Sequence, residues 1–316
     1  MNFPGFLGNE TIKSRLSASA RTGTLGHAWI LSGPAGSGRH TLARILAAAL
    51  QCTGEGTIPC MQCDSCRKIF GGGHTDVITV TDSDKVNLSV KTIRTKVVAD
   101  SFVRPGDGKR KIYILPQPML PAAQNALLKI LEEPPAYCTF IIITESTDQI
   151  LPTVRSRCSQ LQLLPLSDET LRNALREEFP AADEESLISA IQHSGGYLGR
   201  ARDLMAAPPD DTALNSLCDA LVSGDTLAMI RALAPLDSMN RNDFSALLSS
   251  LRSSVAEALL PGAIPGGTHT AATAALSDAI SPAGLYAIME TLSRAISYLQ
   301  GNGSVSLCIG FLLSQL

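Results

Sequence analysis

The first half of the chain alternates short apolar runs with amphipathic stretches, and this alternation constrains the fold more than any other feature. The apolar runs cover residues 27–32, 76–80, 111–115, 139–144 and 160–164. Unbroken apolar runs of this length are typical of parallel strands buried on both faces. Helical patterns lie between them at residues 41–50, 90–102 and 121–132. The repeated strand–helix order predicts an α/β domain, in which helices cover a parallel sheet.

The second half has a different character, because no convincing strand pattern follows residue 164. Ser167 is a suitable helix N-cap, with two acidic residues directly after it. A proline-rich break at 206–211 marks a boundary, and residues 260–270 predict a flexible connection. Apolar side chains share one helical face at Leu285, Ile288, Met289, Leu292, Ile296 and Leu299. We therefore predict that an all-α part follows the α/β domain.

Composition limits the classes of protein that need to be considered. Of the 316 residues, 45% are hydrophobic and 17% charged, which is too apolar for a disordered chain. The net charge of −3 provides no global attraction for nucleic acid, so a free-standing nucleic-acid binder is disfavoured. The first residues lack the layout of a signal peptide, and the apolar runs are too short to span a bilayer. We expect a cytoplasmic protein without a membrane anchor.

The stretch GPAGSGRHT, residues 33–41, has the glycines of a phosphate-binding loop. In the pattern G-x-x-x-x-G-K-[ST], Arg39 stands at the lysine and His40 at the hydroxyl residue. The loop follows a predicted strand and precedes a predicted helix, which is the context such a loop requires. Backbone N–H groups at its end could hold phosphate. The candidate nucleotide-binding residues are Gly33, Gly36, Gly38, Arg39 and Thr41.

Several groups needed for ATP hydrolysis are nevertheless missing. The planar guanidinium of Arg39 is not interchangeable with the ammonium of a lysine at this position. The imidazole of His40 is a poor ligand for Mg²⁺. Thr41 comes one position late on the helix, and the third predicted strand ends in Pro116 and Gln117 instead of Asp-Glu. Neither of these side chains offers a carboxylate for a metal or a water. The pattern predicts lost hydrolysis and makes ATP binding doubtful; a plain strand-to-helix turn is the alternative.

Four of the eight cysteines lie close together, at Cys52, Cys60, Cys63 and Cys66. Paired C-x-x-C turns present thiolates to one tetrahedral Zn²⁺, and a closed four-sulfur site has a structural role. An iron–sulfur cluster fits less well because no Cys-Pro follows at ferredoxin spacing, and free surface cysteines are the remaining alternative. Such a cluster is typical of a reducing cytoplasm. The other four cysteines are most simply buried apolar residues: Cys138, Cys158, Cys218 and Cys308.

Taken in order, several stretches resemble a known family. These are HAWILSGPAGSG, the cysteine insertion at 52–66, NALLKILEEPP at 125–135 and LPTVRSRC at 151–158. Over roughly its first two-thirds the chain resembles bacterial DNA polymerase III clamp-loader subunits of the AAA+ class. This resemblance implies a RecA-like AAA+ α/β domain at residues 1–165, a helical lid at 166–207 and a helical collar for oligomerisation at 208–316.

Within this family, the ATPase subunits keep Lys-Thr and Asp-Glu, whereas the delta-prime type commonly loses them. Gly199 also stands where ATPase members carry a sensor arginine, with Arg200 one place later. The resemblance thus implies a non-hydrolysing, delta-prime-type part of the DNA polymerase III holoenzyme. Its implied partners are the gamma/tau ATPase subunits and the delta subunit, and its implied task is to help load the sliding clamp onto primed DNA.

The resemblance also gives a role to Arg157, in Ser-Arg-Cys. In the family this arginine reaches the γ-phosphate bound by a neighbouring ATPase subunit, and Arg157 is the matching residue. A structural ion pair is the alternative role for Arg157. The alternative function for the whole chain is an active motor-type ATPase that uses Arg39 and Thr41 in unusual roles.

Overall fold

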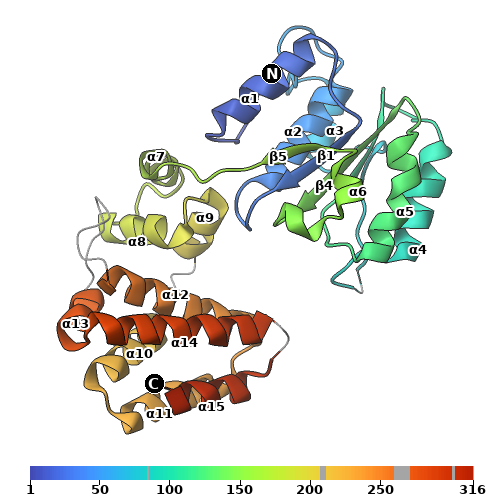
Figure 1. The fold of residues 1–316 in the computed structure, drawn as a ribbon. Coiled ribbons are helices and arrows are strands. Elements are labelled where there is room, and N and C mark those ends of the chain that lie inside the picture. The colour runs from blue at the N-terminus through green and yellow to red at the C-terminus, as the bar shows by residue number, and fades with distance from the viewer. Residues whose placement is uncertain (84, 207–210, 260–270, 301–302, 316) are drawn as a thin grey trace. The chain divides into compact units, whose positions relative to one another are not determined.

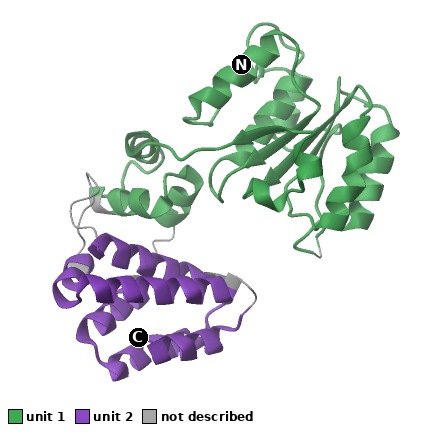
Figure 2. Cartoon of the chain, viewed as in Figure 1, with its two compact units in different colours: residues 1–208 green, residues 209–316 purple. Residues whose placement is uncertain are grey.

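The computed structural model describes residues 1–83, 85–206, 211–259, 271–300 and 303–315. The chain forms two compact units, Met1–Pro208 and Pro209–Leu316 (Figure 2). The first unit contains a sheet and the helices packed on it, followed by three further helices. The second unit, in its described residues, is built from helices.

Five parallel strands form the sheet of the first unit, in the order β2-β3-β4-β1-β5 (Figure 1). Their bounds are β1 Ala28–Ser32, β2 Val77–Thr79, β3 Lys111–Leu115, β4 Cys138–Thr144 and β5 Ser159–Gln162. Strand β1 lies between β4 and β5, and its residue Ala28 pairs with Phe140 of β4. Parallel strands end at the same edge, so the residues that follow β1, β3 and β4 meet there.

Each central strand is buried on both faces, which explains its unbroken apolar sequence. In β1, Trp29 and Leu31 belong to one hydrophobic core, and Ala28 and Ile30 belong to the other. On the Trp29 face pack α1 Glu10–Arg21, α2 Arg39–Gln51 and α3 Asp64–Phe70. On the opposite face pack α4 Val90–Ile93 and α5 Pro121–Glu132 (Figure 1).

Most local predictions for this domain are close to the structure. Helix α5 has the predicted bounds, and the predicted helix at 90–102 consists of α4, a π-helical turn Arg94–Ala99 and a 3-10 turn Asp100–Phe102. Helix α2 begins earlier than predicted, so Arg39 and His40 belong to its first turn. The short elements before β5 are a 3-10 turn Thr147–Gln149 and α6 Pro152–Arg155.

Three helices follow the sheet in the first unit and are called the lid helices below. They are α7 Asp168–Glu178, α8 Glu184–Ser194 and α9 Leu198–Ala206. Ser167 caps α7 as predicted, because its side chain accepts the N–H of Thr170. The lid helices bury a small core of their own, made of Leu171, Leu175, Leu187, Ile191, Leu198 and Ala201.

The second unit is a helical bundle around one hydrophobic core. Its elements are α10 Asp211–Ser223, α11 Thr226–Leu233, a 3-10 turn Ala234–Ser238, α12 Arg241–Leu259, α13 Ala271–Ala279, α14 Pro282–Gln300 and α15 Val305–Gln315. Phe244 and Leu248 of α12 are fully buried with Leu292 of α14. The six apolar residues predicted to share one face of α14 are buried in this core or pack against it.

The predicted order of an α/β domain followed by helices is confirmed, and within the described ranges no strand comes after Gln162. The predicted flexible connection at 260–270 and most of the break at 206–211 lie outside the described residues. The division into domains at 165 and 207 stays a prediction. In the described part of the chain, every helix is too short or too polar to cross a bilayer.

Candidate functional site

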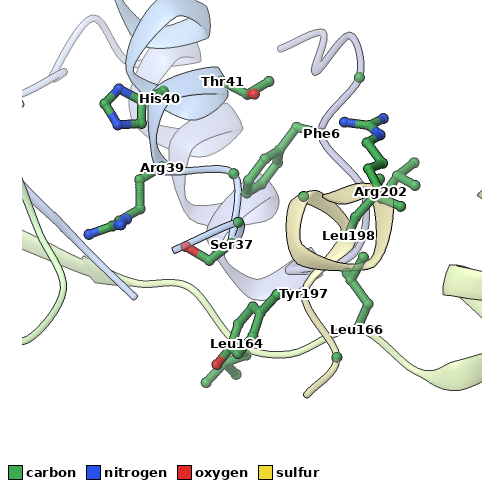
Figure 3. Close-up of a pocket in the computed structure, with 16 residues that line it drawn as sticks. Phe6, Ser37, Arg39, His40, Thr41, Leu164, Leu166, Tyr197, Leu198 and Arg202 are labelled. Carbon is green, nitrogen blue, oxygen red and sulfur yellow. The ribbon is translucent and has the colours of Figure 1, made fainter. Parts of the chain in front are cut away.

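The glycine loop connects β1 to α2 and needs its glycines for backbone geometry. Gly36 has a φ of 77° and Gly38 a φ of 92°, in the left-handed region that side chains disfavour. A cavity of about 220 Å³ lies beside the loop, and Gly36, Gly38, Arg39 and Thr41 are on its wall (Figure 3). Gly33 lies at the end of β1, where its N–H binds the carbonyl of Thr144.

The first turn of α2 carries an arginine and a histidine instead of the usual lysine and hydroxyl. Arg39 is only 9% exposed, and a guanidinium nitrogen lies 3.9 Å from the carboxylate of Glu145. Burial lowers the pKa of Arg39, and Glu145 opposes this shift. Burial also lowers the pKa of His40, and the charges of Arg39 and Arg44 lower it further. A helix N-terminus is itself partially positive, so it too disfavours the charged form of His40.

The side-chain amide of Gln117, just after β3, forms hydrogen bonds with backbone groups of the segment that follows β2. It donates to the carbonyl oxygens of Asp82 at 3.2 Å and Lys85 at 3.0 Å. Its oxygen accepts the N–H of Asp82 at 2.7 Å. These bonds engage both the NH₂ group and the oxygen of the amide, so Gln117 stabilises the segment after β2. Its oxygen is therefore not available to bind a metal ion.

Sequence reasoning missed Glu145, which supplies a carboxylate near the loop. Glu145 directly follows β4, and β4 pairs with β1, so its backbone lies beside the start of the loop. Its side chain is 64% exposed and forms the ion pair with Arg39. An acid directly after the apolar run at 139–144 was the signal that could have identified it.

Arg157 lies on the turn between α6 and β5, and its side chain is 33% exposed. Its guanidinium forms an ion pair with Glu132 at 2.5 Å, at the end of α5. It also donates to the carbonyl of Thr153 at 2.7 Å and to the hydroxyl of Ser156 at 3.1 Å. Arg157 therefore forms a structural ion pair, which was the alternative role considered for it. Its guanidinium is still partly exposed to solvent.

The lid helix α9 contacts the loop through its backbone. The N–H of Gly199 donates to the carbonyl of Gly36 at 3.0 Å. Arg200 is exposed, while Arg202 lies on the cavity wall and binds Glu178, with Nε 2.6 Å from the carboxylate. That hydrogen bond raises the pKa of Arg202. The assignment of position 199 to the sensor arginine of ATPase members stays a prediction.

The structure brings together the four cysteines of the insertion. Cys52 directly follows α2, Cys66 lies in α3, and all four sulfur atoms are within 4.8 Å of one another. The N–H of Cys60 points at the sulfur of Cys52, and the N–H of Cys63 at the sulfur of Cys60, at 3.4 Å and 3.3 Å. The N–H of Cys63 lowers the pKa of Cys60, which favours the thiolate.

This donor set fits a zinc ion. Four sulfurs around Zn²⁺ at bonds of about 2.3 Å lie about 3.8 Å apart, which the observed cluster accommodates. Outside the cluster, burial raises the pKa of Cys138 and Cys218 to about 11 and of Cys158 to about 12. These thiols are protonated and buried or half-buried, as expected for cysteines that only pack.

Comparison with known proteins shows the family of the chain. Residues 8–167 match the family model described as "DNA polymerase III, delta subunit", which is half of the chain. The chain belongs to this family. The matched segment contains the glycine loop, the cysteine cluster and Arg157, so the delta subunit family domain includes all three candidate sites.

Relatives of this delta subunit family member include proteins named for other subunits. It is 31% identical to the DNA polymerase III subunit gamma of Buchnera aphidicola subsp. Schizaphis graminum, over 65% of the chain and 57% of the relative. It is 30% identical to the DNA polymerase III subunit tau of Escherichia coli, over 74% of the chain and 35% of the relative. The chain thus spans about half or less of the length of these relatives.

Solved structures with a similar fold have low sequence identity. A DNA polymerase III gamma subunit-related protein from Thermotoga maritima is 18% identical, with a TM-score of 0.48, over 96% of this chain and 97% of that chain. The Holliday junction branch migration motor RuvB of Thermotoga maritima is 15% identical, with a TM-score of 0.45, over 94% of this chain and 88% of that chain.

Proposed function

We propose that this delta subunit family member is a delta-prime-type clamp-loader subunit that hydrolyses no ATP itself. One observation carries the proposal: the amide of Gln117 binds backbone groups where a hydrolysing site holds a metal-binding acid. Phosphoryl transfer requires Mg²⁺ held by a hydroxyl and a carboxylate beside the phosphates. Without that carboxylate, the loop lacks the charge that anchors the ion.

The remaining residues of the loop do not compensate for this loss. His40 replaces the hydroxyl that would bind Mg²⁺, and imidazole is a poor ligand for that ion. Glu145 is the carboxylate near the loop, but its charge is paired with Arg39. A divalent cation bound there would lie beside a buried guanidinium, which repels it. ATP binding is therefore not part of the proposed role.

The proposed partners follow from the family and from the charge of the chain. They are the gamma/tau ATPase subunits and the delta subunit, and through the assembled complex the sliding clamp and primed DNA. The similarity to gamma and tau proteins supports a place in the same complex. The net charge of −3 supports contact with DNA through the assembly and not through the isolated chain. The proposal places the protein in the cytoplasm.

The proposed architecture has three parts with separate tasks. Residues 1–165 form the AAA+ domain, residues 166–207 the lid and residues 208–316 the collar that binds the other subunits. The separate hydrophobic core of the lid helices supports the boundary at 165. The single core of the second unit supports its action as one body.

Arg157 is the residue proposed to act on a neighbour. Its partly exposed guanidinium can exchange Glu132 for a phosphate of the ATP bound by an adjacent subunit. An exposed ion pair contributes about 1 kcal/mol or less, so exchange costs little. In a closed site, a guanidinium that stabilises phosphoryl charge contributes far more. In the free subunit, Glu132 keeps the guanidinium in place.

The proposed metal is a structural Zn²⁺ held by Cys52, Cys60, Cys63 and Cys66. Zinc in a closed four-sulfur site supplies binding energy to the fold and leaves no position open for a substrate. The cysteines connect the end of α2 to α3, so the ion would fix a segment that has few apolar residues of its own.

Reconstituted clamp loaders containing the Arg157→Ala variant test the role in trans. We expect the ring to assemble and DNA-stimulated ATP turnover by the neighbouring subunits to fall by about 10³-fold at the affected site. The matched control is Arg155→Ala, which removes the arginine at the end of α6 that pairs with Asp148. Unchanged turnover with Arg157→Ala, or an equal loss in both variants, would refute the finger assignment.

The second candidate function is a weak ATPase, because Glu145 places a carboxylate near Arg39. Steady-state hydrolysis by the purified chain, with Mg²⁺ and primed DNA, separates the two functions. We expect no ATP turnover above that of a control reaction without the protein. Turnover that disappears with Glu145→Gln and Arg39→Ala would instead establish the ATPase.

A further inference from the structure

The loop at residues 103–110, which leads into β3, is held by side chains from two other segments of the first unit. The carboxylate of Asp76, just before β2, accepts the N–H groups of residues 106, 107 and 108 at 2.9, 2.8 and 2.6 Å. The side chain of Gln51, the last residue of α2, accepts the N–H groups of residues 109 and 110 at 2.9 and 3.1 Å. Backbone groups with fixed partners of this kind give an irregular loop one defined conformation.

Gln51 lies between this loop and the cysteine cluster. It is fully buried, and Cys52, the first cysteine of the cluster, is the next residue. The amide oxygen of Gln51 accepts the two N–H groups named above, and its amide nitrogen donates to the carbonyl of Arg110. The loop thus engages both ends of the amide, so a shift of the backbone at the end of α2 would break these bonds.

Two lysines make further contacts between the loop and the cysteine segment. The ammonium of Lys109 donates to the carbonyl of Cys52 at 2.8 Å. The ammonium of Lys68, in α3 two residues after Cys66, binds the carboxylate of Asp107 at 2.7 Å. This second pair is exposed and contributes little by itself. Four thiolates around one Zn²⁺ leave a net negative charge, so a cation bound to the backbone of a ligand is favourable there.

These contacts lie at the far end of α2 from the glycine loop. Helix α2 has 13 residues and spans about 20 Å, from Arg39 to Gln51. Parallel strands all begin at one edge of a sheet, so the loop before β3 belongs to the edge opposite the glycine loop. The contacts therefore involve neither the candidate nucleotide-binding residues nor the ion pair of Arg157.

We propose that Gln51 and Lys109 couple the cysteine cluster to the loop at residues 103–110, so that a bound metal ion and the ordered loop stabilise each other. The inference rests on the proposed zinc site and deepens it. Gln51 and Lys109 are positioning residues, which act on the metal ligands through the end of α2. Loss of the metal ion releases the end of α2 and with it residues 109 and 110, whereas residues 106–108 stay held by Asp76.

Hydrogen exchange on the full chain, followed amide by amide with zinc and after removal of zinc by a chelator, tests this coupling. With zinc bound, the amides of residues 106–110 should exchange slowly. After removal of zinc, those of residues 109 and 110 should exchange at least about tenfold faster, because the end of α2 opens locally. Those of residues 106–108 should change less, and those of β1 and β4 should stay protected throughout the experiment.

Gln51→Leu keeps a buried side chain of similar size and removes the bonds to the loop. The amides of residues 109 and 110 should then exchange fast even with zinc bound. Coupling between two sites is reciprocal, so the affinity for zinc, measured by competition with a colorimetric chelator, should fall by about tenfold as well. Gln160→Leu is the matched control, because Gln160 is exposed in β5, outside the loop and the cluster, and it should change neither quantity.

Lys109→Met is a second variant, chosen because Lys109 is exposed and its replacement leaves the buried Gln51 in place. It removes the bond to the carbonyl of Cys52 and should lower the affinity for zinc severalfold. Lys129→Met is its control, because Lys129 is an exposed lysine of α5, and this variant should bind zinc as the wild-type protein does.

Unchanged exchange of residues 109 and 110 after removal of zinc would refute the coupling and leave the proposed zinc site in place. Wild-type affinity for zinc in both Gln51→Leu and Lys109→Met would refute it too. If exchange in β1 and β4 rose to the rate of the loop, zinc would support the whole domain, and the specific coupling would be wrong. A chain that binds no zinc when supplied with it would overturn the proposed metal site together with the coupling.

Discussion

The two ends of helix α2 present opposite combinations of backbone and side chain. At its start, the glycine loop keeps the turn of a phosphate site, but Arg39 and His40 replace the residues that hold phosphate and metal. At its end, Cys52 joins three further cysteines, and all four sulfurs gather within 4.8 Å. One end has the backbone of a phosphate-binding loop with other side chains in its first turn, and the other has four sulfur atoms close enough to hold one metal ion.

Residues of such a site can have structural contacts that involve no ligand. Gly36 has a structural role through its contact with Gly199, and Gln117 has one through the segment after β2. Cys52 and Cys66 are buried in the core of the first unit, and the proposed role of the four sulfurs is to hold a metal ion. We expect the cysteine end of α2 to depend on zinc, and the loop end to depend on contacts within the chain.

The largest effect is expected at the cysteine end. Cys63→Ser should abolish stoichiometric zinc and destabilise the first unit by about 3 kcal/mol or more, because metal binding there contributes directly to folding. Trp29 is the single tryptophan and lies in the same core as Cys52 and Cys66, so its fluorescence reports unfolding of this unit. Zinc content and denaturant unfolding of the purified protein measure both effects.

Cys308→Ala is the control for losing a thiol, because Cys308 is buried in the second unit, outside the cluster. It should leave the zinc content and the Trp29 transition unchanged. If Cys63→Ser retained one zinc per chain, or unfolded with wild-type stability, the two ends of α2 would not differ in the way described above.

A smaller effect is expected from placing an acid at position 117, just after β3. Gln117→Glu replaces an amide that donates to two carbonyl groups by a carboxylate that repels them. We expect a loss of about 1–3 kcal/mol in the free energy of unfolding at pH 7 and no ATP turnover. Denaturant unfolding followed at Trp29 and a steady-state ATPase assay measure the two outcomes.

Gln160→Glu is the matched control, since Gln160 is exposed and its side-chain amide makes a long bond of 3.5 Å to the carbonyl of Arg155. It should change stability by less than about 0.5 kcal/mol. Mg²⁺-dependent hydrolysis in Gln117→Glu would mean that the loop is one residue away from working, and the comparison of the two ends would fail.

Local patterns predicted the fold well because they depend on neighbours along the chain. The apolar runs identified all five strands, and the C-x-x-C spacing identified a cluster whose sulfurs do come together. Metal binding itself stays a prediction, as do the roles of Arg157 and of the loop. The helices α1 and α3 were missed because each has only two buried apolar residues to reveal it.

The contacts between side chains and backbone at the candidate site could not be predicted from local sequence patterns. The pairs Arg39–Glu145 and Arg157–Glu132 and the bond between Gly199 and Gly36 each join elements that are distant in the sequence. The strand order brings β4 beside β1, and only then does Glu145 come near the loop. No periodicity in the chain encodes such a meeting, so the structure was needed to find it.

The smallest expected effect is a pH dependence at the start of α2. Burial and the charges of Arg39 and Arg44 hold the pKa of His40 below its ordinary value in the folded state. The unfolded chain therefore binds more protons at this site, and stability falls as the pH decreases through the unfolded pKa of about 6.5. His40→Gln removes this site, so its unfolding free energy should fall less between pH 7.5 and pH 5.5 than that of the wild-type protein.

The control for this last variant is His193→Gln, because His193 is exposed at the end of α8 and lies in the lid, away from the cations of α2. Its pH profile should match that of the wild-type protein. The slope at His40 should also become shallower in high salt, since screening weakens the repulsion by Arg39 and Arg44. The unfolding free energy of His40→Gln could instead depend on pH as steeply as that of the wild-type protein. The charges of Arg39 and Arg44 would then have no effect on stability through His40.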